Sequence, residues 1–204
     1  MLITLRGHFH KITSVAFSPD GKKCLAGFGD GAACVWDSTT GELIKKVQWQ
    51  RKALTSVAFS PDGERCLTGS EDDSACVWDS TTGVMLAPFM MHRNALLLVT
   101  FSPDGRFIIT ASVDGNLSMW DSKKAELLQH FRPHDCLKSV VISQDRKLII
   151  VGLEGKICLW KNMYSSTWFF KQEEKAVAFK LFMALYPLVQ KKSDLSVEGS
   201  DTAG

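Results

Sequence analysis

The hydrophobic and polar positions follow a pattern that returns every 42 residues along most of the chain. In its first copy, short runs rich in β-branched and aromatic residues (12–17, 23–26, 32–36 and 43–47) are separated by segments of turn-forming residues. Runs of this length between such segments predict β-strands. Both faces of the runs carry residues that can be buried, which is typical of a sheet covered on both sides. The pattern therefore predicts four-stranded sheets packed face to face.

The phrase that carries the repeat is almost unchanged over three copies. "VAFSPDG" stands at 15–21 and again at 57–63, and "VTFSPDG" stands at 99–105. A Trp-Asp pair follows each copy, at Trp36, Trp78 and Trp120, and a worn fourth copy ("VISQDR", "ICLWKN") keeps Trp160 without its aspartate. A period of about 40–45 residues with four strands per repeat indicates the blades of a β-propeller. We therefore expect an all-β propeller with repeats at about 7–48, 49–90, 91–132 and 133–161.

The two ends of the chain depart from complete repeats. Leu2 and Leu5 align with the fourth strand of each repeat, so the chain is expected to open on a fourth strand whose blade has no first three strands upstream. Residues 162–190 are expected to be the degenerate start of a fifth repeat or an apolar tail, and residues 191–204 a disordered tail. We therefore expect an incomplete or small propeller, open rather than sealed, from a fragment or isoform of a longer protein.

Residues 1–161 resemble the WD-repeat family of β-propellers. The resemblance implies that each blade is held by a structural network of histidine, serine or threonine, aspartate and tryptophan. The third repeat is complete, with His92, Ser112, Asp114 and Trp120. The others depart from it: His8, Asp30 and Trp36 with Phe28 at the hydroxyl position; Ser70, Asp72 and Trp78 with Gln50 for the histidine; His134, Glu154 and Trp160 with Gly152 at the hydroxyl position.

Composition narrows the classes of protein. The formal charge is +2, from 24 basic and 22 acidic residues, which argues against nucleic acid or an anionic membrane as partner. The most apolar stretch, 176–189, is interrupted by Lys180 and Pro187 and is shorter than the roughly 18 residues that a membrane span needs. The six cysteines follow the repeat and form no Cys-x-x-Cys pair, which favours buried thiols in a reducing compartment. We expect a cytoplasmic or nuclear protein.

No motif predicts catalysis, a cofactor or a metal. A serine, a histidine and an aspartate approximated in every repeat are better explained as a structural brace than as a triad. "GFGDGA" at 27–32 matches a dinucleotide fingerprint, but a strand follows it where that motif needs a helix. His8 and His10 have no acidic or thiol partner close to them in the sequence, so no metal site is expected.

The resemblance implies a non-catalytic scaffold or sensor platform that binds proteins or peptides, acidic or phosphorylated ones among them. The loops before each first strand, which the family places on one face, supply the candidate contact residues Lys11, Arg51, Lys52, Arg93 and Asn94. Phe28, in a turn of the same face, either anchors a partner or fills the space of the missing hydroxyl. The alternative is a substrate receptor of a cullin-RING ubiquitin ligase, because residues 107–123 resemble a docking box for its adaptor. That box prefers an aliphatic residue at Met119 and arginine at Lys123.

Overall fold

A computed structural model describes residues 4–89, 92–131, 137–142, 148–153 and 156–161 of the chain. The described residues form four antiparallel sheets in which consecutive strands are hydrogen-bonded neighbours. The first sheet contains β1 (Ile12–Phe17), β2 (Lys23–Phe28), β3 (Ala33–Asp37) and β4 (Leu43–Val47). The second contains β5 (Leu54–Phe59), β6 (Arg65–Ser70), β7 (Ala75–Asp79) and β8 (Met85–Phe89). The third contains β9 (Leu96–Phe101), β10 (Phe107–Ser112), β11 (Leu117–Asp121) and β12 (Leu127–Phe131), and the fourth β13 (Leu137–Ile142), β14 (Leu148–Leu153) and β15 (Lys156–Lys161).

The turns explain why the repeated phrase is written as it is. In the Ser-Pro-Asp-Gly turn, the Gly21 N–H donates to the Ser18 carbonyl at 2.9 Å, and Gly21 has a φ of 71°, which favours glycine. The aspartate of the Trp-Asp pair stabilises the turn between the third and fourth strands. The Asp37 carboxylate accepts the backbone N–H groups of Thr39 and Thr40, each at 2.8 Å. Both motifs therefore join neighbouring strands of one sheet.

The core lies between successive sheets, because each first strand packs on the second strand of the sheet before it. A Cβ at Gly27 would lie 2.8 Å from Val57 Cγ1, and one at Gly69 would lie 2.5 Å from Val99 Cγ1. The two glycines therefore allow a close approach of the sheets that a larger side chain would obstruct. Buried residues such as Leu54 and Trp78 complete the interface between the first two sheets.

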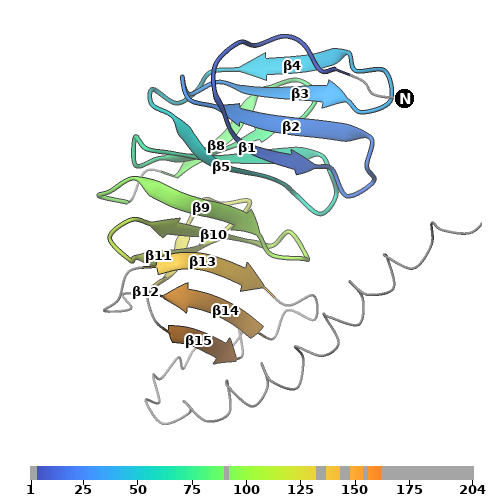
Figure 1. Cartoon of the computed structure of the whole chain (residues 1–204). Coiled ribbons are helices and arrows are strands. Elements are labelled where there is room, and N and C mark those ends of the chain that lie inside the picture. The colour runs from blue at the N-terminus through green and yellow to red at the C-terminus, as the bar shows by residue number, and fades with distance from the viewer. Residues whose placement is uncertain (1–3, 90–91, 132–136, 143–147, 154–155, 162–204) are drawn as a thin grey trace, which may run out of the picture.

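The sheets form an open stack (Figure 1). The first and fourth sheets lie at its opposite ends, and β1 contacts β5, which in turn contacts β9. The outward side of β1 is exposed: Ile12 is 58%, Val15 70% and Phe17 69% accessible. The predicted all-β fold with four recognisable blades is confirmed.

The ends of the chain differ from the prediction or lie beyond the description. Thr4 and Leu5 are not part of a strand. Gly7 instead lies beside the Leu43 side chain, and the Arg6 carbonyl accepts the Trp36 indole N–H at 2.8 Å, so this segment packs on the first sheet. Leu2, His134, Glu154 and the predicted segments 162–190 and 191–204 lie outside the described residues. No described segment forms a helix long and apolar enough to cross a membrane.

Candidate interaction site

The third sheet contains a buried hydrogen-bonded group centred on Thr110. The Trp120 indole N–H donates to Thr110 Oγ1 at 2.8 Å, and His92 Nε2 lies 2.6 Å from the same oxygen. The sequence-based choice of Ser112 as this hydroxyl is wrong, because Ser112 donates its proton to Asp114 instead. Burial lowers the pKa of His92, although the nearby Asp114 carboxylate opposes the shift. A neutral His92 can accept the Thr110 proton at Nε2 while Thr110 accepts from Trp120.

Asp114 is held by the turn rather than by the histidine. It accepts hydrogen bonds from Ser112, from the Asn94 side chain at 2.9 Å, and from both the backbone and side chain of Asn116. Burial raises the pKa of Asp114, but these hydrogen bonds outweigh burial and hold it at about 2. Asn94, predicted as a contact residue, thus has a structural partner.

The second sheet keeps part of the arrangement. Thr68 donates to Gln50 Oε1 at 2.6 Å, and the Gln50 amide donates to the Ser74 carbonyl at 2.9 Å. The buried Trp78 indole N–H has no hydrogen-bond partner. The Ser70 hydroxyl does not replace Thr68, since it donates to the Lys52 carbonyl at 3.2 Å. Asp72 accepts the backbone N–H of Arg51 at 2.7 Å and therefore fixes the loop before β5.

The first sheet has no hydroxyl at the position of Thr110, and its histidine, His8, contacts the aspartate Asp30 instead. Ala26, which pairs with Cys34 as Thr110 pairs with Ser118, occupies the position of the hydroxyl. His8 Nε2 lies 2.9 Å from Asp30 Oδ2, and the Phe28 ring meets the His8 ring edge-on at 4.4 Å. Phe28 is buried, so it is not an exposed anchor; it fills the core beside His8 and Trp36.

The fourth sheet has no hydroxyl at this position either. Val151 is fully buried and pairs with Cys158 in the register that Thr110 and Ser118 have in the third sheet. Gly152, chosen from the sequence as the hydroxyl position, pairs with Ile157 one residue further along. Trp160 belongs to β15, but its side chain is not among those described.

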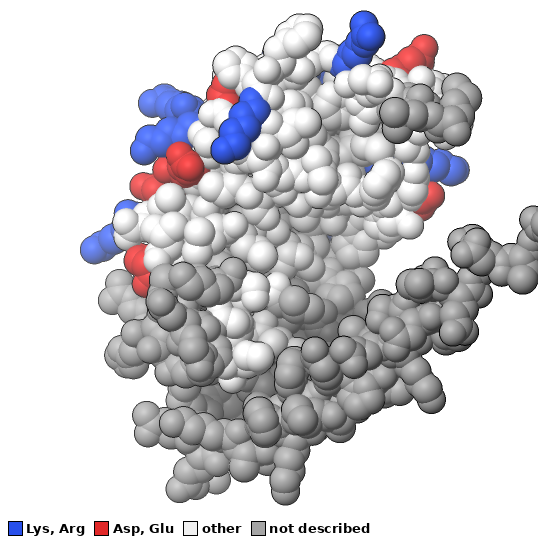
Figure 2. Space-filling model, viewed as in Figure 1, with Lys and Arg blue, Asp and Glu red and all other residues white. Residues whose placement is uncertain are grey.

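The loops before each first strand are less basic than the sequence suggests. Lys11, Arg51, Lys52 and Arg93 are exposed. The turns between second and third strands, which carry Asp30, Glu71, Asp72, Asp73 and Asp114, are tied to the same loops by backbone hydrogen bonds such as Gly29 N–H to Lys11 O at 2.9 Å. Figure 2 shows basic and acidic side chains interspersed along the left edge of the view, where these loops lie. The face therefore presents alternating charge.

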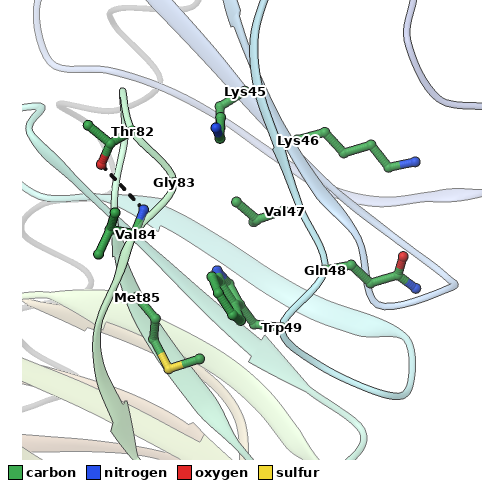
Figure 3. Close-up of a pocket in the computed structure, with 9 residues that line it drawn as sticks. All are labelled: Lys45, Lys46, Val47, Gln48, Trp49, Thr82, Gly83, Val84 and Met85. Atoms are coloured by element: carbon green, nitrogen blue, oxygen red, sulfur yellow. Dashed lines mark hydrogen bonds between the residues drawn. The ribbon is translucent and has the colours of Figure 1, made fainter.

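Sequence reasoning missed a groove between the outer strands of the first two sheets. It has a volume of about 580 Å³ and is lined by residues 45–49 of the first sheet and 82–85 of the second. Lys45, Val47 and Trp49 project toward the 82–85 segment, whereas Lys46 and Gln48 point away from it (Figure 3). Such alternation follows from the strand period of two. The differing sequences of β4 and β8 gave no signal of this groove, because it forms only when the two sheets are side by side.

The groove combines exposed apolar surface with positive charge. Trp49 is 45% and Val84 57% accessible, and Met85 is partly buried beside them. A Cβ at Gly83 would lie 2.7 Å from Lys45 Cε, so the absence of a side chain at this turn lets the carbon stem of Lys45 pack against it. Within the described part of the chain, neither Lys45 nor Lys46 forms an ion pair. The groove can therefore receive an apolar side chain together with an acidic group.

A further correction concerns the two N-terminal histidines. The prediction that no acidic group lies near His8 and His10 is wrong, because Asp30 Oδ2 is 2.9 Å from His8 Nε2 and 3.5 Å from His10 Nε2. The repeat itself contained the signal, since it aligns His8 and Asp30 with the histidine and aspartate of the third blade.

The fold and the repeated networks define a repeat protein of the propeller type. A family model, WD domain, G-beta repeat, matches residues 1–37, 41–79, 85–121 and 125–161. The chain belongs to this WD-repeat family. Domains of the family generally mediate protein–protein interactions as scaffolds and are generally not catalytic. The docking-box residues predicted for a ligase adaptor differ in accessibility, since Met119 is buried and Lys123 is exposed.

Proposed function

We propose that this chain is a non-catalytic interaction module that holds a short acidic segment of a partner protein in the groove between β4 and β8. The observation that carries the proposal is Trp49, a half-exposed tryptophan facing Val84 and Met85 across the groove. Tryptophan is among the residues that most often dominate binding energy at protein interfaces. The exposed apolar area is small, which suits one or two anchoring side chains of a peptide.

The charge of the groove supports an acidic partner. Lys45 projects toward the 82–85 segment at one end of the groove, Lys46 points away from that segment beside it, and the described residues that line the groove include no acidic side chain. An aspartate, glutamate or phosphorylated residue next to an apolar anchor would complement both features, with lysine acting as a point charge rather than as a bidentate ligand. The loop face is a weaker candidate, because its cations alternate with carboxylates.

A peptide-display experiment with the full chain tests the proposal. Random short peptides are selected on the protein, and the binding of enriched peptides is measured by fluorescence anisotropy. We expect sequences that pair an acidic residue with an aromatic or aliphatic one. Trp49→Ala and Lys45→Glu should each weaken binding by about tenfold or more, while thermal unfolding shows that both variants remain folded.

The matched control moves the same charge change to the loop face. Lys11→Glu and Arg93→Glu change exposed charges on the loops before β1 and β9, neither of which lines the groove, and should change affinity less than about threefold. If instead these two variants abolish binding and Trp49→Ala does not, the partner uses the loop face and the proposed groove is wrong. The ligase-receptor alternative rests on the resemblance of residues 107–123 to a docking box that prefers arginine where Lys123 stands, and we therefore rank it second.

A further inference from the structure

Three side chains of metal-binding type converge at one edge of the first sheet. His8, His10 and Asp30 each offer one ligand atom, and these atoms lie within 4.8 Å of one another. His8 Nε2 is 2.9 Å from Asp30 Oδ2, His10 Nε2 is 3.5 Å from the same oxygen, and the two imidazole rings have centroids 5.2 Å apart. The cluster lies in the loop before β1 and the turn after β2, and the Gln48 side chain donates a hydrogen bond to the Asp30 carbonyl at 3.1 Å.

Among the first three repeats, the cluster is particular to the first. At the positions of His8, His10 and Asp30, the second repeat has Gln50, Lys52 and Asp72, and the third has His92, Asn94 and Asp114. In the third sheet the histidine is engaged by Thr110, whereas the first sheet has Ala26 there and leaves His8 to face Asp30. Because the first sheet has no hydroxyl at Ala26, the His8 imidazole is available as a ligand. The first repeat also carries His10 where the third repeat has Asn94, and His10 supplies the second imidazole.

We propose that His8, His10 and Asp30 form a binding site for a divalent transition-metal ion such as Zn²⁺. Two imidazole nitrogens and one carboxylate oxygen are ligands that suit Zn²⁺ and its neighbours Ni²⁺ and Cu²⁺. At metal–ligand distances of about 2.0–2.1 Å, tetrahedral ligands lie roughly 3.3 Å apart. The two contacts to Asp30, at 2.9 and 3.5 Å, bracket that separation.

The surroundings favour a metal over a loose surface cluster. The His8 side chain is only 8% accessible and is backed by the Phe28 ring, so its orientation is fixed. The Ala32 backbone N–H donates to Asp30 Oδ1 at 3.2 Å, an outer-shell contact that orients the carboxylate. His10 is 61% accessible and has the freedom to close the remaining distance. Three protein ligands leave one position open to water or to a donor group of another molecule.

Titration of the full chain with Zn²⁺ tests this site. Isothermal titration calorimetry in a non-chelating buffer should detect one site that His10→Asn weakens at least tenfold. Asn is the residue that the third repeat carries at this position. Because the His10 side chain is exposed, we expect the variant to fold normally, and an unchanged metal-free melting temperature verifies this. Bound Co²⁺ should give the visible absorption of a low-symmetry, nitrogen-ligated ion, and the same variant should lose it.

Two further variants separate a built site from chance binding to surface histidines or cysteines. Ala26→Thr restores the hydroxyl that holds the histidine of the third sheet, and it should weaken Zn²⁺ binding without removing any ligand. Asn94→His adds an imidazole to the third sheet, where His92 is engaged by Thr110, and should create no second site. Unchanged Zn²⁺ affinity in His10→Asn, or an equal new site in Asn94→His, would overturn the proposal.

Discussion

Replacing Thr110 by valine removes the hydroxyl at the centre of the third sheet while keeping the shape of the side chain. Thr110 is fully buried, and its oxygen serves both the Trp120 indole N–H at 2.8 Å and His92 Nε2 at 2.6 Å. A buried polar group that loses its partner destabilises the fold by about 1–3 kcal/mol. Because two groups lose this partner together, we expect Thr110→Val to lower the free energy of unfolding by about 2–4 kcal/mol.

The second sheet supplies the matched control. Thr68 bonds to Gln50 but not to Trp78, whose indole N–H is already without a partner, so Thr68→Val removes one such interaction and should cost about 1–2 kcal/mol. Ser112→Ala, which leaves Thr110 in place, should also cost less than Thr110→Val. Urea denaturation followed by far-ultraviolet circular dichroism gives the three differences. Equal losses for Thr110→Val and Thr68→Val would refute the idea that the tryptophan contact matters.

Two further predictions concern titratable groups. Burial lowers the pKa of His92, so the folded protein keeps it neutral while the unfolded chain binds a proton near pH 6.5; stability should therefore fall as the pH drops below that value. Denaturation between pH 7.5 and 5.5 should show a smaller fall in His92→Gln than in the original chain, and identical pH profiles would contradict the assignment. Among the described thiols, Cys24 is half-buried, whereas burial raises the pKa of Cys34 to about 11 and of Cys76 to about 12. When the native protein is treated with a thiol reagent, Cys24→Ser should show one fewer fast-reacting thiol than the original chain, and Cys76→Ser should show the same number. The reverse result would show that the described burial is wrong.

The strands were predictable because they depend on local pattern. The runs 12–17 and 43–47 coincide with β1 and β4, since β-branched residues bounded by Pro-Asp-Gly and Asp-Ser-Thr-Thr-Gly turns leave little choice. The central hydroxyl was not predictable from the alternation alone. Thr110 and Ser112 point to the same side of β10, and only the register decides between them. Trp120 pairs with Ile108, which places Thr110 roughly 7 Å and Ser112 roughly 13 Å along the strand from that pair.

The surface features were harder to predict because they join segments that are distant in the sequence. Phe28 could be an anchor or a core residue until its neighbours were known, and contact with His8 and Trp36 decides for the core. His10 and Asp30 are brought together by the hairpin of β1 and β2, which places their loops at one edge. Trp49 meets Val84 only because two whole sheets pack side by side.

The open stack also determines how the parts of this molecule share their stability. An inner sheet such as the second is buried against a neighbour on each side, whereas the first has β5 on one side and water on the other, where Val15 and Phe17 stand exposed. In a row of units that contact only their neighbours, the total free energy is close to a sum of unit and interface contributions. Opening can then begin at a terminal unit by breaking a single interface, without disrupting the middle of the row. The proposed metal site lies in the first sheet. An ion bound there would therefore stabilise an end unit, whose opening breaks only one interface between sheets.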